Sequence, residues 1–336
     1  MHRVLLVVPE SNILRPDHNE AEHTARHVLQ SLIELGYFAE IEFVGKDFFE
    51  SANKINDLLR SSRPDLIFNL FDGLENDASC EAVFAQTLEQ NSVAFTGNSS
   101  SVLGRCQNKH GVNEHLKKSG VCVPSSFIFR DAHGHGYDRV MYPAFVKPCF
   151  EDSSLGIDNF SCVSGRNELS RQIQRLLREF PSGVVVEDFI PGDEFAVGIL
   201  NAKNNDIVGV SRLSYKGRTG ELSYLDYSSK WDSDSSSYNS LVPVVCMDKK
   251  EKLYVKAVDT ALSAAAALGC DSYLRVDMRE KDGNMYVIDV NPNPSISPDS
   301  GFVRQAKAAG MDYKQLIKRI VNYAIFNGKN LQSKTA

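Results

Sequence analysis

Apolar residues in the first hundred positions alternate between strand-like and helix-like spacing. A continuous apolar run over 4–8 predicts a strand, and apolar residues at helical spacing over 25–33 predict a helix that ends at Gly36. Further strands are expected over 41–44, 65–71 and 93–96, and further helices over 48–59 and 82–88. A βαβαβαβ order implies a parallel sheet covered on both faces, with ligands at the carboxyl ends of its strands. No G-x-G-x-x-G follows the first strand, so the pattern does not support a dinucleotide-binding fold.

The polar stretch 98–104 is expected to be a linker, because it separates this pattern from two further segments. The first segment is expected to contain a helix over 108–119, a strand over 144–147, a loop over 149–156 and a helix over 166–179. The second opens at Gly183 and carries antiparallel strand patterns over 184–190, 195–201, 207–214, 273–279 and 285–291. The serine-rich stretch 214–241 between these strands is expected to be either a mobile functional loop or disordered.

Composition narrows the class of protein. The 336 residues suffice for two or three domains, and 42% apolar residues are typical of a globular chain. The net charge of −6 argues against a broad surface for nucleic acid, and no N-terminal apolar run is long enough for a membrane span. The seven scattered cysteines include no C-x-x-C pair, which is typical of reduced thiols. We therefore expect a cytoplasmic enzyme with no nucleic-acid or membrane partner.

The most informative stretch is 274–291, where two alternating runs flank Asp282-Gly283, a strong hairpin signal. A three-residue loop would place Asp277 opposite Asp289 and Arg275 opposite Asn291, whereas a two-residue loop would break this facing. We favour the first register, because it includes an apolar face for the core. Two carboxylates and an amide oxygen are hard ligands, suited to a Mg²⁺ that also bridges phosphate oxygens. The alternative is a solvated acidic hairpin.

Two other stretches carry candidate nucleotide chemistry. Lys147 ends an apolar strand and precedes the hydroxyl-rich loop 151–156, so its ammonium and the loop could hold phosphate. The strand 184–190 runs into a turn, where Phe189 and Ile190 could receive a flat heteroaromatic ring. The alternatives are a solvated lysine beside a plain turn, and a plain core strand.

Taken in order, these pieces resemble the ATP-grasp enzymes, and most closely their D-alanine–D-alanine ligase-like branch. The resemblance covers nearly the whole chain, and its specificity lies in the ordered set of motifs rather than in any one of them. The motifs are Asn108-Lys109, Gly120-Val-Cys-Val-Pro124, Lys147-Pro148, Ser153-Ser154-x-Gly156, Glu187 to Ile190, Gly192-x-Glu194, Tyr227-x-x-Lys230, Arg275-x-Asp277 and Asp289-x-Asn291-Pro292.

The resemblance implies that ATP phosphorylates a carboxylate, that an amine attacks the resulting acyl phosphate, and that ADP and phosphate leave. It implies nucleotide contacts from Lys109, Lys147, Ser154, Glu187, Asp188, Ile190, Glu194 and Lys230, and Mg²⁺ or Mn²⁺ ligands in Asp277, Asp289 and Asn291. Arg275 would stabilise the oxyanion, and Ser153 belongs to the catalytic serine loop. Glu20 or Glu22 would hold the donor's ammonium, and Ser300 and Gly301 the acceptor's carboxylate.

Departures from the family pattern concern the substrate rather than the nucleotide. Asp152 stands where the serine loop of D-alanine ligases has glycine, Trp231 where their lid has tyrosine, and Ser295 where a glycine N–H usually helps bind the oxyanion. Phe71-Asp72-Gly73 lies where a histidine-glycine pair is usual. We therefore expect a ligase that joins some other amino acid or small carboxylate to an amine. The alternatives are a true D-alanine–D-alanine ligase and a catalytically silent ATP-binding protein.

The expected architecture is an α/β ATP-grasp fold of three units. An N-terminal parallel-sheet domain over 1–103 precedes a central subdomain over 104–183 and a C-terminal subdomain over 184–330 that carries the metal and catalytic residues. The expected partners are small-molecule substrates, with a homodimer as the one assembly considered.

Overall fold

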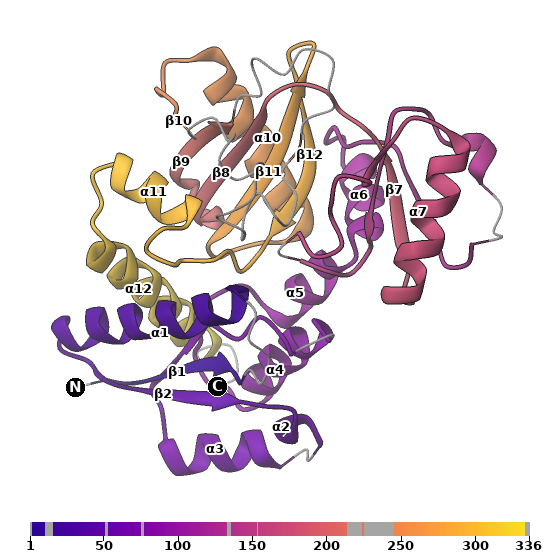
Figure 1. Cartoon of the computed structure of the whole chain (residues 1–336). Helices are drawn as coiled ribbons and strands as arrows, with labels where there is room; N and C mark the ends of the chain where they lie inside the picture. The colour runs from indigo at the N-terminus through magenta and orange to yellow at the C-terminus, as the bar shows by residue number, and fades with distance from the viewer. Residues whose placement is uncertain are drawn as a thin grey trace.

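A computed structural model describes residues 2–10, 16–50, 53–74, 77–132, 136–152, 154–213, 224 and 245–332. The described chain is built around three separate sheets (Figure 1). The stretch predicted as a loop or disordered, 214–241, lies outside the described residues except for Tyr224.

The N-terminal sheet is parallel, as its alternating pattern predicts. Its strands β1 (Arg3–Pro9), β2 (Phe38–Val44) and β3 (Leu66–Asn69) lie in the order β2-β1-β3. Helices α1 (Pro16–Glu34), α3 (Lys54–Ser62) and α4 (Ser79–Gln90) follow these strands in turn. The apolar run 4–8 is almost fully buried, because a central parallel strand is covered on both faces.

Two predictions in this region are wrong. The single helix expected over 48–59 is the short helix α2 (Asp47–Glu50) followed by α3. The strand expected over 93–96 is reduced to one parallel bridge between Ile67 and Phe95, so it does not extend the sheet.

The stretch expected to be a linker is also different in the structure. Helix α5 (Ser100–Gln107) begins inside this stretch, and α6 (Lys109–Lys118) follows. Val102, Leu103 and Cys106 of α5 are buried at helical spacing, a signal that the serines before them obscured. The predicted boundary at 103/104 therefore falls inside a helix.

The central sheet has four strands, β4 (Ser126–Phe129), β5 (Ala144–Pro148), β6 (Cys162–Val163) and β7 (Val184–Asp188), in the order β4-β7-β5-β6. Helix α7 (Arg166–Glu179) packs on it, with its buried residues in the same apolar cluster as Val146 and Val184. Strand β7 pairs with β5, so 184–188 lie in the central sheet and not in the C-terminal segment to which we assigned them.

The C-terminal sheet is antiparallel and has five strands in the order β10-β9-β8-β11-β12. These are β8 (Glu194–Asn201), β9 (Asp206–Leu213), β10 (Val245–Cys246), β11 (Leu274–Lys281) and β12 (Asn284–Asn291). Helix α10 (Lys252–Leu268) packs against this sheet. Helices α11 (Gly301–Ala308) and α12 (Tyr313–Gln332) share a core with the N-terminal sheet, in which Phe302 and Ile317 join Leu6 and Phe68.

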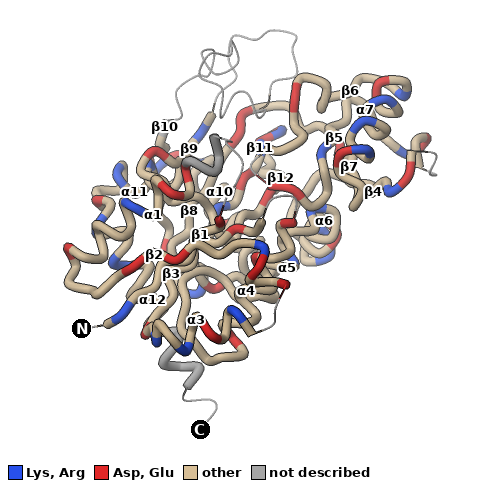
Figure 2. The backbone as a smooth tube through the Cα atoms, turned by 60° about the horizontal axis from the view of Figure 1, so that its bottom comes forward, with Lys and Arg blue, Asp and Glu red and all other residues tan. Residues whose placement is uncertain are grey.

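Charged residues of both signs are mixed along the chain. Figure 2 shows Lys and Arg interspersed with Asp and Glu over the described backbone. None of the described helices combines the length and the apolar character needed to span a bilayer.

Candidate functional site

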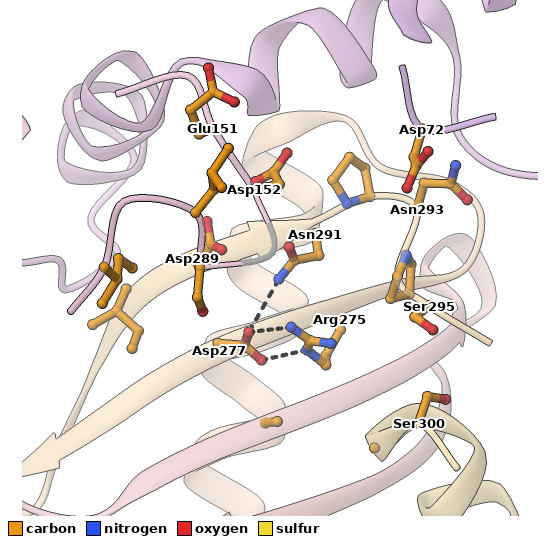
Figure 3. A pocket seen from close by; sticks show the side chains of 18 of the residues that line it. Asp72, Glu151, Asp152, Arg275, Asp277, Asp289, Asn291, Asn293, Ser295 and Ser300 are labelled. Carbon is orange, nitrogen blue, oxygen red and sulfur yellow. Dashed lines mark hydrogen bonds and ion pairs between the residues drawn. The ribbon is translucent and has the colours of Figure 1, made fainter. Parts of the chain in front are cut away.

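A cavity of about 1050 Å³ opens where the three sheets approach one another. The N-terminal part of the chain lines it with Glu20, the central sheet with Lys147, and the C-terminal sheet with Arg275 and Asp289. Residues from all three predicted units therefore meet at one cavity (Figure 3).

The β11–β12 hairpin places its acidic residues opposite each other through a combination of turn and bulge that the sequence did not indicate. The turn holds two residues, Asp282 and Gly283, with φ of 52° and 74°. The pairing then shifts by one residue between Met278 and Asp277, so that Ile288 is the extra residue of a β-bulge. Beyond the bulge, Asp277 lies opposite Asp289 and Arg275 opposite Asn291. The predicted facing is confirmed, and the three-residue loop offered as its reason is wrong.

Arg275 and Asp277 form a bidentate ion pair on one face of β11. Arg275 donates to the two carboxylate oxygens of Asp277 at 2.8 and 2.7 Å, and Asn291 Nδ2 donates to Asp277 Oδ2 at 3.1 Å (Figure 3). Burial alone would lower the pKa of Arg275, but Asp277, with Asp289 and Glu194, outweighs burial and raises it. The guanidinium is therefore a fixed positive charge at the cavity wall.

Lys109 lies between two carboxylates that also line the cavity. Its Nζ is 2.8 Å from Asp152 Oδ1 and 3.9 Å from Asp289 Oδ1, and its side chain is 9% exposed. Burial alone would lower the pKa of Lys109, but Asp152 and Asp289 raise it above its ordinary value. The ammonium thus stays charged in a buried position.

Lys147 is held by a second buried acid. Its Nζ lies 2.9 Å from Glu187 Oε2 and donates to the carbonyl oxygen of Ile288, the bulge residue, at 3.1 Å. Asn113 of α6 donates to Glu187 Oε1 at 2.8 Å. Sequence reasoning missed Asn113, although its spacing of four residues from Lys109 puts both on one face of α6.

Several other nucleotide residues predicted from the resemblance also line the cavity. Asp188, Ile190 and Glu194 line the cavity, as does Ser154, whose φ of 64° is in the left-handed region. Phe189 also lines it, and the Arg279 guanidinium lies 4.8 Å from the centre of the Phe189 ring. Ser153, Lys230 and Trp231 lie outside the described residues.

The structure distinguishes Glu20 from Glu22, the two acids that the sequence left as alternatives for holding the donor's ammonium. Glu20 lines the cavity, and its Oε1 accepts a hydrogen bond of 2.9 Å from Ser295 Oγ. Glu22 instead forms an exposed ion pair with Arg26 one turn along α1. Ser300 and Gly301 line the cavity at the start of α11, where Ser300 Oγ accepts from the backbone N–H of Val303.

Glu81 of α4 is a functional candidate that the sequence did not indicate. Its side chain is buried at the cavity, and its Oε1 accepts a hydrogen bond of 3.0 Å from Asn293 Nδ2. Burial raises the pKa of Glu81 from 4.5 to about 8, even though the hydrogen bond from Asn293 lowers it; the charge of Asp72 adds to the rise. No motif marks such a residue, because its environment comes from distant segments.

The donor set suits a hard cation bound together with phosphate. Among the residues that the structure describes, no group of three or more His, Cys, Asp or Glu side chains is arranged to hold a metal by itself. Asp277, Asp289 and Asn291 offer two carboxylates and an amide at one end of the hairpin. They fit Mg²⁺ or Mn²⁺ if phosphate oxygens complete the coordination shell.

Comparison with known proteins identifies relatives over most of the chain. A family model described as the C-terminus of D-Ala D-Ala ligase matches residues 129–322. A D-alanine–D-alanine ligase A from Bacillus cereus is 28% identical over 71% of this chain and 74% of its own length. A D-alanine–D-alanine ligase from Marinomonas is 30% identical over 79% of each chain. The structure of a D-alanine–D-alanine ligase from Bacillus anthracis complexed with ATP superimposes with a TM-score of 0.71 at 20% identity, covering 98% of this chain and 99% of that one.

Proposed function

The chain belongs to the D-Ala–D-Ala ligase family of ATP-grasp proteins, and from this we propose that it joins an amino acid or small carboxylate to an amine through an acyl phosphate. As a member of this family it is an ATP-dependent ligase that forms a C–N bond, and it uses ATP and Mg²⁺. The amine is often that of a second amino acid.

The observation that carries the proposal is the register of the β11–β12 hairpin. It sets Asp277 opposite Asp289 and Arg275 opposite Asn291 in a cavity that Lys109 also lines. When bound, Mg²⁺ would supply positive charge to the phosphates of ATP. We assign the metal to Asp277, Asp289 and Asn291.

The remaining groups divide between the nucleotide and the reacting atoms. We assign phosphate to Lys109, Lys147, Ser154 and Lys230, the base and ribose to Glu187, Asp188, Ile190 and Glu194, and a place beside the reacting carboxylate to Ser153. ATP transfers its terminal phosphoryl group to the carboxylate, ADP leaves, the amine attacks the carbonyl carbon, and phosphate leaves. Arg275 stabilises the oxyanion that develops during this attack, which is a transition-state interaction.

The substrate end of the cavity supports a zwitterionic substrate. We assign a substrate ammonium to Glu20, and a substrate carboxylate to Ser300 and Gly301 at the start of α11, where backbone N–H groups favour negative charge. Asp72 and Ser295 line this end in place of the residues usual in D-alanine ligases. We therefore propose a substrate other than D-alanine, with Trp231 as a further substrate residue.

We further propose cytoplasmic small-molecule chemistry for this protein. All seven cysteines are free, which supports a reducing compartment, and the net charge of −6 supports the absence of a nucleic-acid partner. We keep the three proposed units but move the second boundary from 183 to about 190, because β7 pairs within the central sheet. We propose no membrane partner, and we propose a homodimer as the assembly.

The test is phosphate release from Mg-ATP in the presence of pools of L- and D-amino acids. We expect turnover that requires an added amino acid and that Asp289→Asn abolishes. Asp282→Asn is the matched control, because it removes the same charge from the exposed turn of the same hairpin and should keep turnover.

The other outcomes separate the alternatives. Turnover with D-alanine alone would identify a true D-alanine–D-alanine ligase. ATP binding without turnover across all pools would identify a silent ATP-binding protein. Formation of ADP with a carboxylate but no amine would identify a carboxylate kinase, and would overturn the proposed ligation.

A further inference from the structure

The two described lysines that we assign to the phosphates are each paired with an acid of the protein itself. Lys109 Nζ lies 2.8 Å from Asp152 Oδ1, and Lys147 Nζ lies 2.9 Å from Glu187 Oε2. A nucleotide that binds here therefore does not meet two free ammonium groups. Its phosphates must compete with carboxylates that already hold these positions.

The two pairs differ in how easily the acid can leave. The Glu187 side chain is 4% exposed and also accepts a hydrogen bond from Asn113, so its carboxylate is fixed inside the protein. The Asp152 side chain is 51% exposed and lies in the loop between β5 and β6. Within the described part of the chain, its carboxylate accepts a side-chain hydrogen bond from Lys109. Asp152 is therefore the acid that an incoming phosphate can replace.

Displacing Asp152 brings negative charges together. Asp289 Oδ1 is 3.9 Å from the same ammonium, and Asp277 faces Asp289 across the hairpin. A phosphate that takes Lys109 from Asp152 would lie near three carboxylates, and the nearby cations are Lys109 itself and Arg275, which is already paired with Asp277. Such an arrangement is unfavourable unless a cation arrives with the phosphate, because like charges in a partly buried site repel strongly.

We propose that Asp152 is an internal anion that occupies the phosphate position of Lys109 in the free protein and makes nucleotide binding depend on a divalent cation. Asp152 is thus a positioning residue that acts through Lys109. The inference rests on the proposed function, since it takes Lys109 as a phosphate ligand. It concerns a feature of this chain, because the serine loop of the D-alanine ligases has glycine at this position.

The test measures the dissociation constant of a non-hydrolysable ATP analogue by calorimetry, once with excess Mg²⁺ and once with EDTA. We expect the wild type to bind well with Mg²⁺ and weakly in EDTA. Asp152→Asn and Asp152→Gly should each tighten the binding in EDTA about tenfold, the usual scale of a charge-assisted hydrogen bond. The dissociation constant with Mg²⁺ should change much less. The ratio of the dissociation constant in EDTA to that with Mg²⁺ should therefore be smaller in both variants than in the wild type.

The control variant is Asp138→Asn. It removes the same charge from an exposed aspartate of the central unit that pairs with Arg166, away from the cavity, and should leave both constants as they are. Since Asp152 is half-exposed, both of its variants should also melt within a few degrees of the wild type.

Three results would count against the inference, and they are distinguishable. Equal binding by the wild type and both Asp152 variants in EDTA would show that Asp152 does not compete with phosphate. Weaker binding of the Mg²⁺ complex by Asp152→Asn would make Asp152 a ligand of the nucleotide or metal instead. A wild type that binds no analogue under either condition would overturn the proposed function itself, and this inference with it.

Discussion

Glu81 shows how a single residue can carry chemistry without a sequence motif. It lies on α4 among apolar neighbours, and its only signal is an acid at a buried helical position. In the folded chain it meets Asn293, more than two hundred positions away, and the charge of Asp72. Burial in the folded chain raises the pKa of Glu81 to about 8. The carboxyl thus keeps its proton at pH values at which an exposed glutamate is ionised.

This raised pKa predicts a pH dependence of stability with a definite sign. Below pH 4.5 the carboxyl is protonated in both states, so its burial carries no charge penalty. Between pH 4.5 and about 8 the unfolded chain loses the proton first, so the free energy of unfolding falls as pH rises, and above about 8 the full penalty remains. Glu81→Gln keeps a group that can accept the Asn293 hydrogen bond and removes the titration. It should be more stable than the wild type at pH 8.5, by on the order of a few kcal/mol.

Urea unfolding at pH 5, 7 and 8.5 would measure this effect. The difference in unfolding free energy between Glu81→Gln and the wild type should shrink steadily toward pH 5. A difference that stays constant over the three pH values would mean that Glu81 does not titrate in this range.

At the scale of elements, the hairpin shows what the sequence could and could not predict. Asp282-Gly283 and the alternating runs predict two strands, and the structure contains them. The bulge was not predictable, because Val287, Ile288 and Val290 are all apolar and give no sign of which one is extra. The structure settles this: Val287 and Val290 face the core, whereas Ile288 lines the cavity.

The prediction of a linker over 98–104, after the N-terminal sheet, is wrong for a related reason. Asn98 and three serines have the composition of a linker, and composition alone led to that prediction. In the structure Asn98 is fully buried and bonded to segments near 271 and 292. Local patterns describe neighbours in sequence, so a polar residue whose partners are distant is read as exposed.

The bulge itself can be tested by removing its extra residue. Without Ile288, the strand pairing that begins at the turn would continue past Met278 with no shift. Asp289 would still lie opposite Asp277, and the alternation of buried residues would be kept. The deletion would remove the carbonyl oxygen that accepts from Lys147. We expect the deletion to preserve the fold and to raise the KM for ATP about tenfold, the scale of a hydrogen bond to a charged group.

Ile288→Ala is the matched control, because it shortens the side chain and keeps the carbonyl. Its KM should rise less than that of the deletion in steady-state assays with saturating amino acid. Equal effects of the two variants would assign the role to the side chain and not to the bulge.

At the scale of the whole molecule, the N-terminal and C-terminal parts share a common core, and the buried side chain of Asn98 is one of the polar contacts that join them. Leu6 and Phe68 of the N-terminal sheet pack in one cluster with Phe302 of α11 and Ile317 of α12. Asn98 adds directional contacts to this packing. Its Nδ2 donates to the carbonyl oxygens of Tyr273 and Pro292, at 2.9 and 2.7 Å. Its Oδ1 accepts from the backbone N–H groups of Asp271 and Ser272. One side chain thus satisfies four backbone groups at the ends of β11 and β12.

These four contacts predict that Asn98 supports both stability and turnover. Asn98→Ala would leave the four groups without their partner in a buried place, and should lower the free energy of unfolding by about 2–4 kcal/mol. Ser101→Ala, at an exposed position on α5, should change it by less than about 0.5 kcal/mol.

Because Tyr273 lies two residues before Arg275 and Pro292 directly follows Asn291, the loosened strand ends should also lower kcat at a temperature where the variant is fully folded. Urea unfolding and steady-state kinetics on the same preparations would measure both effects. A variant that loses stability but keeps the wild-type kcat would show that Asn98 joins the two parts of the molecule without positioning the catalytic strands.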